Sequence, residues 1–170
     1  MLLILLTAAL GGLCILLGLR VPALAALAVL AVLACRALRR SHRDPLTGLY
    51  NLRHLRSQER AYRRRELAVW YFDLDHLKQV NDTQGHRAGD RLLLELSQAL
   101  RTCPHPGAKA YRIGGDEFLL ILPAPSEKDE PPLNDLDTIP ASWGRTRGSG
   151  AELDSLIDQA ERHMYQNRSR

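Results

Sequence analysis

The stretch Gly114-Gly115-Asp116-Glu117-Phe118 decides the fold of this chain. It separates residues 110–113 from the apolar run 118–122, a pattern that predicts a β-hairpin whose glycines occupy turn positions needing positive φ. The glycines would let a phosphate or a base approach the backbone, and the oxygen atoms of Asp116 and Glu117 suit Mg²⁺. The stretch alone is equally compatible with an ordinary hairpin that has a solvated acidic tip.

Acidic residues also end the apolar, aromatic-rich run Leu67–Asp73, which predicts a buried strand. Acids at the carboxyl end of such a strand commonly present metal ligands from a rigid element, whereas polar groups buried there without a role are costly. Of the two carboxylates Asp73 and Asp75, Asp75 is the weaker candidate for a metal ligand. Strand alternation is expected to send it to the side opposite its neighbour, where it caps the next helix.

The motifs of this chain, in their order, resemble those of the GGDEF family of diguanylate cyclases. The matching segments are residues 44–51, 73–82, 85–90 and 112–118. The resemblance implies an α/β fold, an α+β sandwich with a central and mostly antiparallel sheet, similar to nucleotidyl cyclase and polymerase palm domains. It also implies an enzyme that condenses two GTP molecules into cyclic di-GMP and releases pyrophosphate.

The resemblance assigns a divalent metal, Mg²⁺ or Mn²⁺, to acids from both motifs. Its expected ligands are carboxylates and one backbone carbonyl, from Asp73, Asp116, Glu117 and Leu74. Asp116 and Glu117 are also the expected catalytic residues. Attack of a 3′-hydroxyl on an α-phosphate needs a metal that acidifies the nucleophile and offsets charge on the leaving pyrophosphate, which agrees with this set.

Substrate contacts are implied in the same way. Asn81 and Asp90 would recognise the guanine edge, Lys78 would contact the terminal phosphates, and the nucleotide would lie against Gly114 and Gly115. Arg168 is expected to replace a lysine of the family that binds phosphate. Because one hairpin offers only half of a site for two nucleotides, the enzyme is expected to work as a homodimer with one GTP in each subunit.

The C-terminal third departs from the family pattern. Residues 124–140 form a loop-like stretch rich in proline and acids where the family has a helix. Its loss would uncover part of one sheet face, or leave that face to the loop or to a partner. Residues 141–144 resemble the end of a strand, and 151–165 predict the last helix. No secure match to the family's final arginine is found up to Arg170. The alternative function is therefore a catalytically silent module that binds GTP or a protein partner.

The N-terminal residues differ in composition from the rest of the chain. Residues 1–43 contain no Asp or Glu and five arginines. Two apolar runs, 1–19 and 21–35, predict a two-helix transmembrane hairpin within residues 1–38, followed by a basic linker over 39–43. A cleaved signal peptide is the alternative, but no basic region precedes the first run. The positive-inside rule places the domain of residues 44–170 in the cytoplasm, at the bacterial inner membrane.

The charge balance argues against a nucleic-acid partner. The chain has 23 basic and 19 acidic residues, and five of the basic ones lie in residues 1–43. The remaining domain is therefore close to neutral and lacks the broad basic face that nucleic-acid binding requires.

Overall fold

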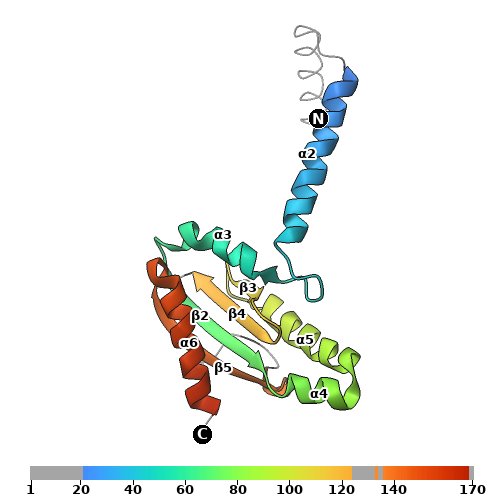
Figure 1. Ribbon diagram of the computed structural model, residues 1–170. Helices are drawn as coiled ribbons and strands as arrows, with labels where there is room; N and C mark the ends of the chain where they lie inside the picture. The colour runs from blue at the N-terminus through green and yellow to red at the C-terminus, as the bar shows by residue number, and fades with distance from the viewer. Residues whose placement is uncertain (1–20, 124–132, 134–135, 169–170) are drawn as a thin grey trace. The chain divides into compact units, whose positions relative to one another are not determined.

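The computed structural model describes residues 21–123, 133 and 136–168 (Figure 1). The chain divides into two units, residues 1–41 and 42–170. In the first unit, helix α2 (Val21–Ser41) carries exposed aliphatic side chains, among them Leu27 and Leu30. Within the described residues, no helix combines the length and the apolar character needed to cross a membrane. The first predicted span lies outside those residues, so the predicted hairpin over 1–38 is not supported.

The described part of residues 42–170 folds around a five-stranded sheet with the order β1-β3-β4-β2-β5. The strands are β1 (Tyr50–Asn51), β2 (Glu66–Leu74), β3 (Lys109–Arg112), β4 (Glu117–Pro123) and β5 (Ala141–Ser149). Strands β1 and β3 pair in parallel, and the other neighbouring strands pair antiparallel. The predicted mostly antiparallel α+β fold is confirmed.

Helices cover both faces of this sheet, which explains why the central strand β2 is a continuous apolar run. Helices α3 (Leu52–Tyr62) and α6 (Leu153–Arg168) pack on the face that carries Val69 and Tyr71. Helix α5 (His86–Arg101), which follows α4 (Leu77–Gln84), packs on the face that carries Trp70 and Phe72. Alternate residues of β2 therefore enter two separate apolar clusters, an α6-side cluster and an α5-side cluster.

Part of segment 124–140, which the sequence predicted to be a loop, lies against the sheet. Leu133, Leu136 and Ile139 pack on the α5-side cluster, and Leu136–Thr138 form the short 3₁₀ helix η1. The sequence left three outcomes for this face: exposure, coverage by the loop or coverage by a partner. In the described residues, the chain's own loop covers it. Residues 124–132 and 134–135 lie outside the described residues.

The C-terminal elements follow the predicted order with different bounds. Strand β5 begins at Ala141, where the end of a strand was expected, and continues to Ser149 along the whole length of β2. The 3₁₀ helix η2 (Gly150–Glu152) leads into α6, whose buried side chains include Leu156 and Met164.

Candidate functional site

The end of strand β2 and the tip of the β3–β4 hairpin lie side by side. Asp73 pairs in register with Glu117, and the backbone N–H of Leu74 donates to the carbonyl of Asp116 over 3.2 Å. Burial, and next the negative charge of Asp116, raise the pKa of the Asp73 carboxyl. The predicted convergence of acids from two strands is therefore found, and it produces a cluster of negative charge at this edge of the sheet.

The glycines of the hairpin tip do not have the backbone conformation that the sequence predicted. Among the described glycines, positive φ is found at Gly48, Gly85 and Gly107, so the prediction of positive φ at the tip is wrong. A Cβ on Gly114 would lie 2.0 Å from Oε2 of Glu117, whereas one on Gly115 would meet nothing within 4 Å. Gly114 therefore makes room for the Glu117 carboxylate, and Gly115 leaves the outer surface of the tip open.

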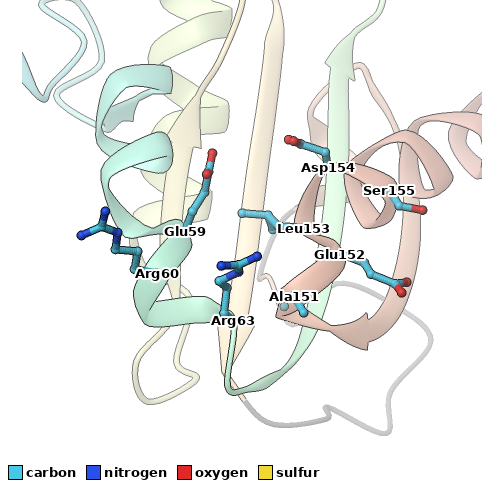
Figure 2. A pocket seen from close by; sticks show the side chains of 9 residues that line it. Glu59, Arg60, Arg63, Ala151, Glu152, Leu153, Asp154 and Ser155 are labelled. Atoms are coloured by element: carbon cyan, nitrogen blue, oxygen red, sulfur yellow. The ribbon is translucent and has the colours of Figure 1, made fainter.

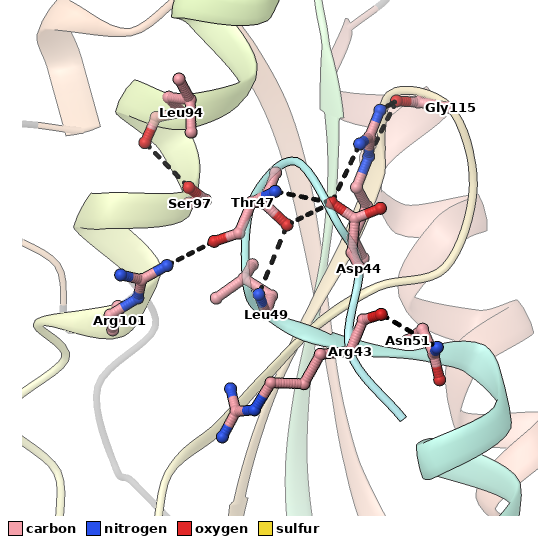
Figure 3. A network of polar contacts seen from close by, with 10 residues as sticks. Arg43, Asp44, Thr47, Leu49, Asn51, Leu94, Ser97, Arg101 and Gly115 are labelled. Carbon is pink, nitrogen blue, oxygen red and sulfur yellow. Dashed lines mark hydrogen bonds and ion pairs between the residues drawn. The ribbon is translucent and has the colours of Figure 1, made fainter. Parts of the chain in front are cut away.

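Arg112 ties this tip to the turn at the start of the domain, as Figure 3 shows around Asp44, Thr47 and Gly115. Its Nη1 donates to Oδ1 of Asp44 over 3.1 Å, and its Nε and Nη2 donate to the carbonyl of Gly115 over 3.2 and 2.6 Å. Asp44 Oδ1 also accepts from the backbone N–H and the hydroxyl of Thr47. Burial opposes ionisation of Asp44, but hydrogen bonds from Thr47 and Arg112 outweigh it and lower its pKa.

Sequence reasoning missed this role of the turn. Asp44 and Arg112 are 68 positions apart, and nothing local pairs them. The available signal was an arginine two residues before the glycine pair in a chain whose entry turn contains an acid, Asp44. A further tie comes from Arg101 of α5, which donates to the carbonyl of Thr47.

Arg168 reaches the strand-end acids from the last turn of α6. Its Nη1 lies 3.1 Å from Oδ1 of Asp73, and its Nη2 donates to Oδ1 of Asp75. Asp75 also accepts a hydrogen bond of 2.8 Å from the hydroxyl of Ser142 on β5. The expectation that Asp75 points away and caps the next helix is wrong. Residues two apart on an extended chain share a side, and α4 starts after His76 without a side-chain cap.

The residues predicted to recognise guanine lie on α4 and α5. A Cβ on Gly89 would lie 2.0 Å from Oδ1 of Asn81, so Gly89 makes room for the amide of Asn81. Asp90 is the next residue and is exposed, as is Lys78 on α4. Gly85, with a φ of 84°, joins the two helices in a sharp turn. An amide and a carboxylate therefore come from adjacent helices, and these begin shortly after the acids of β2.

The donor set at the strand ends fits a divalent cation. Within the described residues, no group of three or more His, Cys, Asp or Glu side chains is arranged to hold a metal. Mg²⁺ usually needs only one or two carboxylates, and it takes its other oxygens from water and substrate phosphates. Asp73 and Asp116, two oxygen donors of like charge in a partly buried place, meet that requirement.

A cavity of about 510 Å³ lies elsewhere, between the end of α3 and the start of α6 (Figure 2). Its walls include Arg60 and Arg63 on one side and Glu152, Asp154 and other residues around η2 on the other. None of the predicted site residues lines this cavity. This cavity is therefore separate from the residues predicted to bind the nucleotide.

Comparisons with known proteins place these motifs in a family. Residues 41–136 match the family described as "Diguanylate cyclase, GGDEF domain". The chain is 30% identical over 145 residues to the diguanylate cyclase VdcA of Vibrio cholerae, covering 72% of this chain and 43% of that protein. It is 44% identical over 81 residues to the cyclic di-GMP phosphodiesterase PdeB of Shewanella oneidensis, covering 46% of this chain and 10% of that protein. The chain thus spans less than half the length of either relative.

A solved structure agrees with the fold. The coiled coil and GGDEF domain of DgcB from Caulobacter crescentus, in complex with c-di-GMP, superimposes with a TM-score of 0.69 at 22% identity. The match covers 87% of this chain and 91% of that one. The architecture built above is therefore that of the GGDEF domain in DgcB.

Proposed function

We propose that this chain, which belongs to the GGDEF family of diguanylate cyclase domains, condenses two GTP molecules into cyclic di-GMP and releases pyrophosphate. One observation carries the proposal: Asp73 and Asp116 come together where β2 ends beside the hairpin. The relative VdcA bears the name of this activity. Mg²⁺ or Mn²⁺ is the proposed cofactor.

In this proposal, Asp73 and Asp116 hold the metal with help from Glu117 and the carbonyl of Leu74. When bound, the metal acidifies the attacking 3′-hydroxyl and offsets charge on the leaving pyrophosphate. Burial, and next the neighbouring Glu117 carboxylate, raise the pKa of the Tyr71 hydroxyl, so the two side chains lie close together. Such positioning from a buried strand keeps the oxygen donors fixed while the substrate binds.

The other predicted residues bind and orient GTP. Guanine presents N–H donors on its Watson–Crick edge, and the Asp90 carboxylate is a suitable acceptor for them, next to the Asn81 amide. Lys78 and Arg168 would bind phosphate oxygens as cations. The open surface at Gly115 lets the nucleotide approach the backbone. Most of the required catalysis is then positioning of two reactants.

The site needs two nucleotides, and one hairpin offers half of it, so we propose a homodimer with one GTP per subunit. Product formation should then rise more steeply than linearly with protein concentration below the dimerisation constant. A specific activity that stays constant over this range would contradict the dimer.

The decisive experiment uses the full chain with GTP and Mg²⁺, with the nucleotides separated by chromatography. We expect cyclic di-GMP from the wild type and none from Asp116→Asn. The matched control is Asp154→Asn, which changes the same group at an exposed position on α6 and should leave product formation intact. Failure of the wild type to form cyclic di-GMP at concentrations that allow dimers would contradict the proposal.

A silent module that binds GTP or a protein partner is the second candidate. Two points favour it: the loop that the sequence predicts in place of a family helix, and the contact of Arg168 with Asp73, the proposed metal ligand. The relative PdeB also bears the name of a different activity. GTP binding by calorimetry without turnover would support this candidate, and turnover would exclude it.

For localisation, we propose that residues 1–43 attach the chain to the bacterial inner membrane with the domain in the cytoplasm. Support comes from the lack of acids in this stretch and from Leu27 and Leu30, which are 62% and 63% exposed on α2. Hydrophobic side chains exposed in this number usually meet lipid or a partner. Fractionation of cells expressing the tagged chain tests this, with the membrane pellet expected to hold the protein until detergent is added. Recovery from the aqueous fraction would contradict it.

A further inference from the structure

The carboxylates at the end of β2 already have a cation, supplied by the chain itself. The guanidinium of Arg168 bridges Asp73 and Asp75 with two different nitrogens, each on one oxygen. The side chains are only partly accessible, with 35% of Arg168 and 18% of Asp73 exposed. A pair screened this far from water is stronger than an exposed surface pair.

Several elements hold this cation in place. Asp75 is fixed by the hydroxyl of Ser142 and by its own backbone N–H, which donates to the carbonyl of Pro140 over 2.8 Å. Helix α6 ends at Arg168, and the partial negative charge of a helix C-terminus favours a cation there. The same helix is anchored on β5 at Gly144, where a Cβ would lie 2.1 Å from the carbonyl oxygen of Ala160. Arg168 is therefore delivered by rigid parts of the fold.

The arrangement places two functions on one carboxylate. Oδ1 of Asp73 accepts from Arg168, and the same carboxylate is the proposed ligand of the divalent metal. The guanidinium already neutralises this carboxylate and repels a second cation beside it, so Arg168 and the metal each oppose the binding of the other. Arg168 has a second contact, with Asp75, that does not involve Asp73.

We propose that Arg168 is a resident counter-ion of the Asp73 and Asp75 carboxylates, displaced from Asp73 when the divalent metal binds. This inference rests on the proposed function, because it takes Asp73 as a metal ligand. Asp75 and Ser142 act as positioning residues that retain the guanidinium beside the site. The released Nη1 can then donate to an incoming phosphate oxygen, while Nη2 stays on Asp75.

The inference predicts that removing Arg168 tightens metal binding in the absence of any nucleotide. The test is a titration of the full chain with Mn²⁺, with the free ion measured by electron paramagnetic resonance. Arg168→Met should bind Mn²⁺ about tenfold more tightly than the wild type, the factor expected when one charge-assisted contact no longer competes. Arg168→Lys, which keeps the charge but loses the fork, should fall between them.

Arg162→Met is the matched control, because it removes the same charge from an exposed position on the same helix. It should bind Mn²⁺ as the wild type does, which separates direct competition from a general change in net charge. Equal Mn²⁺ affinities for the wild type, Arg168→Met and Arg168→Lys would overturn this inference but leave the proposed function standing. Absence of Mn²⁺ binding in all four proteins would instead overturn the metal site, and with it the proposed function. Circular dichroism of each variant confirms that the chains compared are folded.

Discussion

At the scale of single residues, Arg112 connects the hairpin tip to the entry turn, a role that the motif does not indicate. One planar side chain holds both Asp44 and the Gly115 carbonyl, and the pair with Asp44 is only 14% and 16% exposed. Its removal would free the hairpin tip and leave a buried carboxylate without its cation. The geometry depends on the fork of guanidinium donors, which an ammonium group cannot reproduce.

We therefore predict that Arg112→Lys lowers the free energy of unfolding by about 1–3 kcal/mol. Product formation should fall as well, because the tip that carries Asp116 loses its anchor. Urea unfolding followed by circular dichroism measures the first effect, with Arg91→Lys on the exposed side of α5 as the control. If both variants unfold at the same urea concentration, the contact does not stabilise the domain.

The surroundings of His54 lead to a prediction of how the free energy of unfolding depends on pH. Its ring stacks on Tyr50 with centroids 3.9 Å apart, and its Nδ1 lies 3.2 Å from Nδ1 of His42. Burial, and then the nearby charges of Lys109, His42 and Arg43, lower the pKa of His54 in the folded state. The unfolded chain therefore binds a proton at a higher pH than the folded one, so stability falls as pH drops below about 6.5.

The check compares urea unfolding at about pH 7.5 and pH 5.5 for the wild type and His54→Phe. The variant keeps an aromatic ring on Tyr50 but does not titrate, so it should lose less stability over this interval. Groups common to both proteins that do not contact His54 cancel in this comparison. A pH dependence that is identical in the two proteins would show that His54 does not contribute.

At the scale of elements, the sequence predicted what local pattern controls and missed what tertiary contacts control. The apolar run of β2, the hairpin and the apolar face of α6 follow from periodicity, and the structure contains all three. The partners of Asp75 and the ties of Arg112 join residues far apart in the chain, so no local rule reaches them. The room that Gly114 leaves for the side chain of Glu117 is likewise a contact that the motif alone does not predict.

The contact of β5 with α6 gives a prediction at this scale. A Cβ on Gly144 would lie 2.1 Å from the carbonyl oxygen of Ala160 and 2.2 Å from the backbone nitrogen of Met164. Backbone atoms of a helix cannot move aside as a flexible side chain can. Gly144→Ala should therefore force α6 away from the sheet and cost about 1–3 kcal/mol or more, as overpacked cores do.

Gly115→Ala is the control for that substitution, since nothing lies within 4 Å of the added atom. It should change the free energy of unfolding by less than about 0.5 kcal/mol. Thermal unfolding of both variants provides the comparison. Equal melting temperatures would mean that α6 does not rest on β5 as closely as the structure places it.

At the scale of the whole domain, each apolar face of the sheet needs helices or loops that cover it. Helices α3 and α6 cover one face, whereas the other combines α5 with the short segment around η1. Three apolar side chains of that segment pack on the α5-side cluster, so they carry more of the stability than a surface loop normally does.

We predict that Leu136→Ala lowers the free energy of unfolding of the domain by about 1–2 kcal/mol, below the value for a fully buried leucine because Leu136 is half-buried. Leu94→Ala on α5 is the matched control, because Leu94 is 42% exposed and should cost less than about 0.5 kcal/mol. Urea unfolding of both variants measures the two losses of unfolding free energy. Equal, small effects would mean that the segment does not close the sheet, and that this face is open to a partner. A selective loss for Leu136→Ala would show that the segment around η1 completes the core on the α5 side of the sheet.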